Sequence, residues 1–423
     1  MEMVSEEELG RVTYEIFTKL EKKWLSGWLN KEEKNTEERK IRILSIDGGG
    51  LKGLISGQAL VYLEKKLKEK SGDPDARIAD FFDVIAGTGI GGVFASMLLA
   101  DDGNGRPLFA AEDAVKIIAE KISNIFRPSG FFRRRWPSRR FDGLLRNLLS
   151  RAGRPMTLRD SLKPLLIPCY DLNSAAPFVF SRADAVESKG FDFELWRVCR
   201  ATCATPNRFK PVHLSSMDGR TGVTAIDGGL VMNNPSAAVV THVLHNKRDF
   251  PKVNGVEDLV LLSLGNGGFR TPGKLTGCRK SFSGEWGKGV VEIVLDGVSD
   301  TVDQILGNAF FRNPQDYVRI QFFNAVMFAL GLAQNAHKRG PLSGNGFSAS
   351  KEVDASVNGV IALVSAGEGM LREKAVETLP LGGKRLLTET NGQRLDSFAK
   401  RLVESTKAVP LSPSKANADK PAG

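Results

Sequence analysis

Cysteine is scarce in this chain, whose 423 residues include four, at positions 169, 199, 203 and 278. So few cysteines fit a reducing compartment rather than a disulfide-built secreted domain. Cys199 and Cys203 lie one helical turn apart, but no second pair matches them, which favours small core residues over a zinc site. Residues 1–10 are acidic and lack the basic-then-apolar order of a signal peptide, so we expect a cytoplasmic protein.

Long apolar runs are missing as well. No stretch approaches the ~20 apolar residues that a membrane-spanning helix needs, so any membrane contact should be peripheral. Hydrophobic residues make up 41% and charged residues 26% of the chain, a balance typical of a globular protein with a sizeable core. The net charge of +10 makes anionic surfaces the expected partners, either phospholipid or nucleic acid, and charge alone does not choose between them.

Strands and helices are predicted to alternate from residue 41 onward. Ile41–Ile46 and Val84–Ala86 are expected to be short buried strands, each followed by a glycine-rich turn and a helix. Further strands are predicted at residues 164–172, 177–181, 222–227 and 258–265. This alternation predicts an α/β fold in which helices flank a central sheet.

Composition divides the chain into four parts. Residues 1–40 combine an amphipathic helix, which we expect to pack on the main domain, with a charged linker. Residues 41–350 carry the predicted α/β domain. Residues 351–408 are predicted to form a peripheral helical extension, and the polar residues 409–423, which carry proline and lysine, are predicted to be a disordered tail.

Both glycine-rich turns fit the dinucleotide-binding pattern G-x-G-x-x-G, through the glycines at 48, 50 and 53 and at 87, 89 and 92. A dinucleotide site also needs a second strand that ends in Asp or Glu about 20 residues later. The strand after the first turn ends at Ala86, and the acids after the second turn, Asp101 and Asp102, follow a helix. These positions argue against a dinucleotide cofactor.

Acyl transfer makes different demands, and the turn 47-DGGGLKG-53 meets one of them. Its backbone N–H groups precede a helix and have no Cβ atoms in the way, which suits the oxyanion that forms when a carbonyl is attacked. Lys52 and Gly53 lie nearby, and Lys52 can add positive charge. A turn that merely needs positive φ is the simpler explanation, but such a turn does not need so many glycines.

Asp227 is the candidate base. It closes the predicted strand 222–227 and begins 227-DGGLVMNNP-235, in which two glycines leave room for a substrate or a neighbouring loop. Asp-Gly-Gly alone is a common turn, so the assignment of Asp227 as a base depends on the other motifs. The second turn, Gly87-Thr88-Gly89-Ile90-Gly91, has the spacing of the nucleophile elbow G-x-S-x-G with glycine in place of serine.

Together these motifs resemble the patatin-like phospholipase family over roughly residues 41–321. The matching stretches are 44-LSIDGGGLKG-53, 78-IADFFDVIAGTGIGG-92, 141-FDGLL-145, 195-LWRVCRATCATP-206, 225-AIDGGLVMNNP-235 and 261-LLSLGNG-267. The resemblance implies a central, mostly parallel sheet between helices and a Ser–Asp dyad that uses no histidine, metal or organic cofactor. It also implies that Gly48, Gly49 and Gly50 form the oxyanion hole and that Asp227 is the dyad aspartate.

The chain departs from that family at the nucleophile. Gly89 stands where the family has serine, which resembles a plant patatin-related subgroup with the motif G-x-G-x-G. Three accounts compete: Asp227 activates a water in the space of the missing side chain, Thr88 substitutes as nucleophile, or the protein binds lipid without hydrolysis. We expect weak release of fatty acids from membrane glycerolipids, with a catalytically inactive lipid-binding protein as the alternative.

Aromatic and arginine side chains alternate in 126-FRPSGFFRRRWPSRRF-141. A solvated basic loop is the simplest explanation, and single-stranded RNA binds to the same chemistry. Next to a lipolytic site, docking to an anionic membrane is the better functional prediction. The docking candidates are Phe131, Phe132, Arg133, Arg134, Arg135 and Trp136. No calcium-ligand pattern is visible, so activity should be independent of calcium.

Overall fold

The computed structural model describes residues 39–126, 137–206, 209–267, 285–321, 357–378 and 384–407. The chain separates into a unit of residues 1–39 and a unit of residues 40–423. The predicted N-terminal helix and the tail 409–423 lie outside the described residues. All the elements below belong to the second unit.

The described part of this unit is built on an eight-stranded sheet with the order β10-β9-β1-β2-β5-β8-β7, in which β6 also pairs with β5. Its strands are β1 (Ile41–Ile46), β2 (Val84–Gly87), β5 (Leu165–Asp171), β6 (Ala176–Ser181), β7 (Val212–Ser215), β8 (Gly222–Ile226), β9 (Leu259–Leu264) and β10 (Tyr317–Ile320). The five strands from β10 to β5 are parallel, whereas β6, β7 and β8 pair antiparallel. The predicted α/β fold with a mostly parallel sheet is confirmed.

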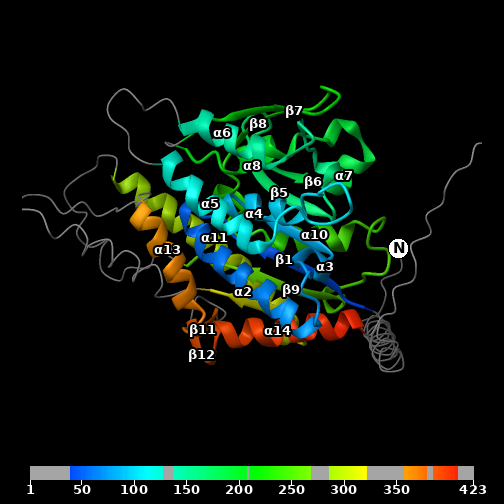
Figure 1. Cartoon of the computed structure of the whole chain (residues 1–423), viewed down its shortest axis with the longest axis vertical. Helices are drawn as coiled ribbons and strands as arrows, with labels where there is room; N and C mark the ends of the chain where they lie inside the picture. Colours follow the sequence, from blue (N-terminus) through cyan, green and yellow to red (C-terminus); the bar gives the residue numbers. More distant parts are fainter. Residues whose placement is uncertain are drawn as a thin grey trace, which may run out of the picture. The chain divides into compact units, whose positions relative to one another are not determined.

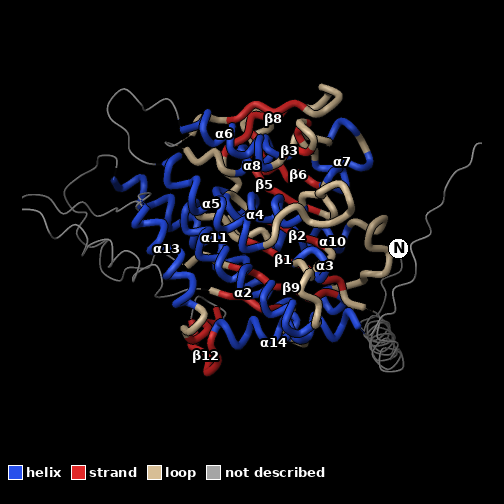
Figure 2. The backbone as a smooth tube through the Cα atoms, viewed as in Figure 1, coloured by secondary structure: helices blue, strands red, loops and turns tan. Residues whose placement is uncertain are grey.

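Helices cover both faces of the sheet, as Figures 1 and 2 show. The strand sequences IRILSI and LVLLSL are apolar without a polar face because both sides are buried. In β1, Leu44 and Ile46 pack on one face and Ile43 on the other. The first face carries α2 (Gly53–Ser71), α4 (Ile90–Leu99), α5 (Ala111–Phe126) and α8 (Leu195–Thr202), and the second carries α10 (Ser236–His245) and α11 (Glu285–Ala309).

The register brings the ends of three parallel strands level. Ile46, the last residue of β1, pairs with Gly87 at the end of β2 and with Leu264 at the end of β9. The turns after these strands therefore meet at one edge of the sheet, which is where open α/β sheets bind ligands. Smaller described elements surround this frame: α3 (Ile78–Phe81), α6 (Pro137–Leu148), α7 (Arg182–Glu187), α9 (Gly229–Met232) and the hairpin β3 (Ser150–Arg151) with β4 (Arg154–Pro155).

The C-terminal extension differs from the helical, peripheral segment that the sequence predicts. It contains α13 (Val357–Met370), the antiparallel pair β11 (Lys374–Thr378) and β12 (Lys384–Thr390), and α14 (Asn391–Lys407). The helix α14 lies beside α2 (Figure 1), and the rings of Phe398 and Phe82 stack at 6.5 Å. The extension is helical in α13 and α14, whereas the β-hairpin between them was not predicted, and α14 buries its apolar stripe in the main core.

The lengths and apolar contents of the described helices can be compared with those of a membrane-spanning helix. None of them combines the length and the apolar content that a bilayer crossing requires.

Candidate active site

Gly89 occupies a sharp turn between β2 and α4. Its backbone has φ +54° and ψ −127°, a combination that non-glycine residues adopt only under strain. Its N–H donates to Thr202 Oγ1 at 3.0 Å, which fixes the turn from the side of α8. This is the backbone geometry of a nucleophile elbow, a strained strand-to-helix turn that presents one side chain at the end of the sheet.

The neighbouring glycines are required by close backbone packing. A Cβ atom on Gly87 would lie 2.3 Å from the carbonyl oxygen of Gly91. A Cβ atom on Gly91 would lie 2.5 Å from the carbonyl oxygens of both Ile46 and Asp47. These distances are shorter than any van der Waals contact, so α4 can start this close to β1 and β2 only with glycine at both positions.

Space at Gly89 itself is open. A Cβ atom there would lie 3.6 Å from Gly48 Cα and 3.9 Å from both Gly49 N and the Thr202 carbonyl oxygen. These are ordinary contact distances, so a side chain fits and would face the glycine-rich turn. The turn therefore has the backbone angles of an elbow and enough space for a side chain at position 89, but glycine supplies no nucleophile there.

Thr88 does not replace the missing serine. Its side chain is fully buried, and its Oγ1 donates to the carbonyl oxygen of Met232 at 2.7 Å. This hydrogen bond anchors the elbow to the end of α9 and holds the hydroxyl group of Thr88 there. This contact removes Thr88 from the candidate nucleophiles.

The glycine-rich turn offers two backbone donors rather than three. Gly48 is buried, and its N–H donates to the carbonyl oxygen of Asn233 at 2.9 Å, so it is not available to a substrate. Gly49 and Gly50 have φ +126° and +59° and are exposed. Within the described ranges, neither of their N–H groups donates a hydrogen bond. These two donors precede α2, where the helix dipole adds positive potential.

Lys52 and Gly53 lie deeper than the exposed glycines. Lys52, in the short 3₁₀ turn Gly50–Lys52, is 1% exposed, so its charge acts from inside the protein. A Cβ atom on Gly53 would lie 2.8 Å from Ile90 Cγ2, because the start of α2 presses against the start of α4. Lys52 therefore lies behind the exposed glycines, and Gly53 lets the two helices approach.

A buried ion pair holds the base of the glycine-rich turn. The Arg319 guanidinium on β10 donates to both carboxylate oxygens of Asp47, at 2.8 and 2.6 Å, and also to Ser263 Oγ at 2.7 Å. Burial alone would lower the pKa of Arg319, but the charge and hydrogen bonds of Asp47 raise it, so the guanidinium stays protonated. Sequence reasoning missed Arg319 because it lies 272 residues from Asp47.

Asp227 directly follows β8, and each of its two carboxylate oxygens accepts one hydrogen bond. Its Oδ2 accepts from Thr205 Oγ1 at 2.6 Å, and its Oδ1 accepts from the Gly229 N–H at 2.8 Å. Burial raises the pKa of the carboxyl group, and the two hydrogen bonds partly oppose that rise. A carboxylate with a raised pKa, held in one orientation, is suited to act as a general base.

Hydrogen bonds join the three sequence motifs at this edge. Thr202 accepts from the Gly89 N–H through its hydroxyl and from the Gly228 N–H, at 3.4 Å, through its carbonyl. Two carbonyl groups in the segment after Asp227 accept hydrogen bonds from the other motifs. The Met232 carbonyl accepts from Thr88 Oγ1, and the Asn233 carbonyl accepts from the Gly48 N–H. The structure thus brings together Gly89, the glycine-rich turn and the Asp227 loop. Thr202 and Thr205 lie in the quoted stretch 195–206, but nothing in their spacing identified their roles.

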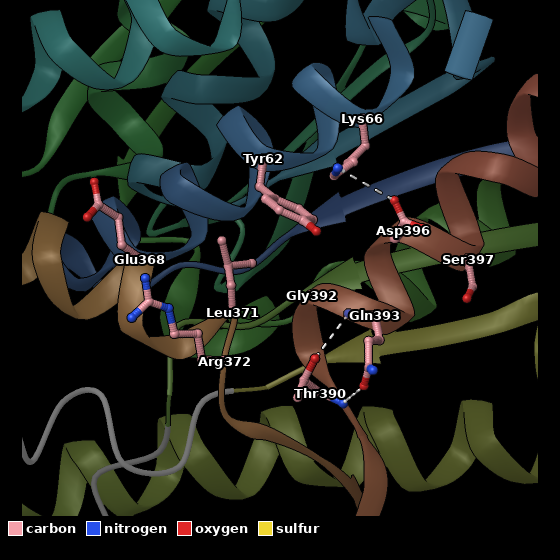
Figure 3. Close-up of a pocket in the computed structure, with 10 residues that line it drawn as sticks. All are labelled: Tyr62, Lys66, Glu368, Leu371, Arg372, Thr390, Gly392, Gln393, Asp396 and Ser397. Carbon is pink, nitrogen blue, oxygen red and sulfur yellow. Dashed lines mark hydrogen bonds and ion pairs between the residues drawn. The ribbon is translucent and has the colours of Figure 1, made fainter. Parts of the chain in front are cut away.

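A cavity of about 810 Å³ lies elsewhere, between α2, α13, β12 and α14 (Figure 3). Lys66, which lines it, lies 13 residues beyond Gly53 on α2, or about 20 Å along the helix axis. Lys66 Nζ pairs with Glu69 at 2.6 Å and Asp396 at 4.0 Å, and Thr390 and Gln393 cap α14 through mutual hydrogen bonds. This cavity is separate from the elbow, and several of its polar groups satisfy one another.

The predicted membrane-docking residues 131–136 lie outside the described residues, so that prediction stays a prediction. The segment that follows is well anchored. Arg200 on α8 donates to Asp142 on α6 at 2.8 Å, and its guanidinium lies 4.3 Å from the centroid of the Phe209 ring. Among the described residues, no three His, Cys, Asp or Glu side chains are grouped as metal ligands.

Comparisons with known proteins show which family the chain belongs to. Residues 44–240 match the family model described as patatin-like phospholipase. The chain is 50% identical to an Arabidopsis thaliana protein named "Probable inactive patatin-like protein 9", over 98% of both chains. This chain belongs to the patatin-like phospholipase family. Two further A. thaliana relatives, patatin-like proteins 6 and 7, are 41% and 42% identical over 94% and 93% of this chain and 84% and 80% of their own.

Solved structures add little to this assignment. The patatin-like chain matches VipD from Legionella pneumophila over 78% of its own length and 67% of that chain, at 12% identity and a TM-score of 0.28. A likeness this low carries no argument about the site.

Proposed function

We propose that this patatin-like chain binds the acyl groups of membrane glycerolipids, such as phospholipids and galactolipids, and hydrolyses their ester bonds slowly. One observation carries the proposal: the open space at Gly89 faces Gly49, one of the two exposed backbone donors. A water molecule in that space has the position of a serine hydroxyl. The reaction class is carboxylic ester hydrolysis of the phospholipase A type, in a member of the G-x-G-x-G subgroup.

The proposed reaction is a single displacement. Asp227 takes a proton from the water while the water oxygen bonds to the ester carbonyl carbon. The carbonyl oxygen becomes an oxyanion and accepts hydrogen bonds from the Gly49 and Gly50 N–H groups. When the carbonyl re-forms, the bond to the alcohol oxygen breaks, and the Asp227 carboxyl returns the proton to that oxygen. The products are a fatty acid and a lysolipid, and no acyl-enzyme forms.

Magnitudes favour slow turnover. In a well-studied serine protease, removing the nucleophile costs about 10⁶ in kcat, yet about 10³ over the water reaction survives through the oxyanion hole and substrate binding. A site with the same kinds of groups and no serine should hydrolyse at a comparably small residual rate. The raised pKa of Asp227 helps, since a stronger base is a better partner for water.

A second function is favoured by a separate observation. Gly89 has no hydroxyl and Thr88 is bound to Met232, so no described residue at the elbow supplies a nucleophile. A relative that is 50% identical is itself named as a probable inactive protein. The second candidate is therefore a lipid-binding protein that turns nothing over and acts in lipid signalling or growth regulation.

Membrane docking is proposed through residues 126–141. Phenylalanine and tryptophan side chains enter the headgroup region while arginines pair with lipid phosphates. Replacing Arg133, Arg134 and Arg135 together by glutamine should abolish binding to vesicles that contain anionic lipid. Sedimentation with such vesicles measures this, and undiminished binding by the triple variant would reject the loop as the docking element.

Fatty acid release from phosphatidylcholine and galactolipid vesicles tests the proposed hydrolysis. The purified wild-type protein should release fatty acid above the buffer rate, and Asp227→Asn should not, because asparagine cannot accept the proton from water. The same release from both proteins would reject Asp227 as the base. No release from either protein, together with retained lipid binding, would favour the second candidate.

A further inference from the structure

Asn266 follows β9 at the edge of the sheet that carries the elbow. The residue before it is fixed through both backbone groups: the Gly265 N–H donates to the Ile320 carbonyl at 2.9 Å, and the Gly265 carbonyl accepts from Ser56 Oγ at 2.8 Å. Asn266 itself is 7% exposed. The backbone that carries the Asn266 side chain is therefore held in place by hydrogen bonds to β10 and α2.

The amide of Asn266 rests against the glycine-rich turn. A Cβ atom on Gly49 would lie 2.2 Å from Asn266 Nδ2, 2.8 Å from its Cγ and 3.1 Å from its Oδ1. Only glycine at position 49 leaves room for this amide. The contact places an amide group beside one of the two exposed backbone donors of the turn.

The amide nitrogen of Asn266 is also unsatisfied. Nδ2 is buried and donates to no group in the part of the chain that the structure describes. Burying a donor without a partner is costly, and such groups in folded proteins usually have a functional or ligand-dependent explanation. Rotation of the amide about the Cβ–Cγ bond exchanges its nitrogen and oxygen within the same volume. The donor can thus reach either side of the space beside Gly49.

We propose that Asn266 is the third hydrogen-bond donor of the oxyanion site, acting with the backbone N–H groups of Gly49 and Gly50. It replaces the donor that Gly48 loses to Asn233. The ligand class is an oxygen that carries negative charge on a tetrahedral centre, such as the oxyanion formed from a glycerolipid ester. The assignment rests on the proposed function, because it deepens the role of the same site.

An alkyl fluorophosphonate tests this role without requiring turnover. In Gly89→Ser, the hydroxyl oxygen of the introduced serine should attack phosphorus, Asp227 should take the hydroxyl proton, and fluoride should leave as the P–O bond forms. The phosphoryl oxygen then occupies the oxyanion site. Intact-protein mass spectrometry measures the rate of labelling. The wild-type protein, which lacks the serine, is the unlabelled control.

The decisive comparison is between Gly89→Ser alone and the same protein with Asn266→Ala or Asn266→Asp. Loss of one oxyanion donor should slow labelling by about 100-fold in both double variants. Aspartate has the shape of asparagine and preserves packing, but it brings a negative charge that alanine does not bring. A similar slowing in both variants therefore identifies the lost donor, rather than lost packing or charge repulsion. Thermal unfolding midpoints of all three proteins confirm that folded species are compared.

The outcomes separate this inference from the proposed function. Labelling of Gly89→Ser that is equally fast with Asn266→Asp or Asn266→Ala would overturn the assignment of Asn266 and leave the rest of the site intact. A Gly89→Ser protein that folds but is not labelled at all would overturn both the proposed site and the role of Asn266. Slow labelling of both double variants would support both.

Discussion

At the scale of single residues, the turn at Gly89 differs from a G-x-S-x-G turn by two heavy atoms, the Cβ and Oγ that Gly89 lacks. The turn keeps φ +54° and ψ −127°, although a glycine at this point no longer has a side chain to present. The close contacts of Gly87 and Gly91 explain this persistence, because they lock α4 against β1 and β2 whatever stands at position 89. The elbow geometry is therefore a property of the packing around it.

The first prediction concerns strain at position 89. Gly89→Ala and Gly89→Ser should each lower the free energy of unfolding by about 1–3 kcal/mol, the cost of placing a Cβ atom at this φ and ψ. Because the nearest atoms lie at 3.6 Å or beyond, no steric clash should add to that cost. Urea denaturation measures both values. A loss well above this range, common to both variants, would show that the space at Gly89 is not open.

A second prediction concerns Asp227 and pH. The pKa of Asp227 is raised in the folded protein from an ordinary value of 3.8, so its ionised form destabilises the fold. The destabilisation is complete above the folded pKa and vanishes as pH falls below the unfolded value. Asparagine can keep both contacts, since Oδ1 still accepts from Gly229 and the Thr205 hydroxyl can accept from the amide. Asp227→Asn should therefore be the more stable protein at about pH 8.

The same pair of proteins supplies the check on sign. Thermal unfolding from about pH 8 to about pH 4 should show the stability difference between Asp227→Asn and wild type shrinking as Asp227 becomes protonated. A difference that grows toward low pH would mean that the pKa of Asp227 is lowered by folding. In that case Asp227 would be a poorer base than the mechanism requires.

At the scale of secondary-structure elements, the site depends on neighbouring strand ends that the register holds level. β1, β2 and β9 end together and carry the glycine-rich turn, the elbow and Asn266. The ion pair between Asp47 and Arg319 connects the first of these turns to β10, at the edge of the sheet. The glycine-rich turn therefore depends on β10, a strand that contributes no group to the proposed reaction.

Breaking the ion pair between Asp47 and Arg319 should strongly lower the free energy of unfolding. Arg319→Met leaves the Asp47 carboxylate buried without its partner and should cost about 3–5 kcal/mol of unfolding free energy. Adding Asp47→Asn removes the stranded charge, so the double variant should recover part of that loss. Urea denaturation of the two proteins measures the coupling. Equal stability of the single and double variants would show that Asp47 is not held as an ion.

Local patterns made much of this arrangement predictable. The strand, turn and helix around Gly89 lie within about a dozen residues, so periodicity and glycine spacing were enough to predict the elbow turn and an α/β fold, while the parallel sheet came from the family resemblance. The contacts that complete the site join distant segments, as Arg319 does with Asp47 and Asn266 with Gly49, and no local spacing encodes them. The hairpin of β11 and β12 was missed for a different reason, because its sequence carries the turn signal Gly382-Gly383 directly before β12 and this signal was overlooked.

At the scale of the whole molecule, the described C-terminal elements form part of the main core. Leu395, Phe398 and Leu402 of α14 are buried in the cluster that contains the apolar face of α2. α2 in turn begins directly after the glycine-rich turn. The family model covers residues 44–240, so α14 lies beyond it, and its packing couples the C-terminal segment to the helix that follows the glycine-rich turn.

Phe398 tests whether α14 belongs to the same cooperative unit. Phe398→Ala should lower the free energy of unfolding by about 3–5 kcal/mol, because it leaves a cavity between α14 and α2. Leu386→Ala is the matched control, since Leu386 on β12 is 66% exposed and should change stability by less than about 0.5 kcal/mol. A negligible effect of Phe398→Ala would show that α14 is dispensable to the core.

The central claim is that the chain retains a patatin-like acyl hydrolase site from which only the nucleophile is missing. The most direct measurement is fatty acid release from phosphatidylcholine vesicles by wild type, Gly89→Ser and Gly89→Ser with Asp227→Asn. We predict that Gly89→Ser gains substantial activity over wild type and that the double variant loses the gain. A folded Gly89→Ser protein no more active than wild type, or a gain that survives the loss of Asp227, would contradict the claim.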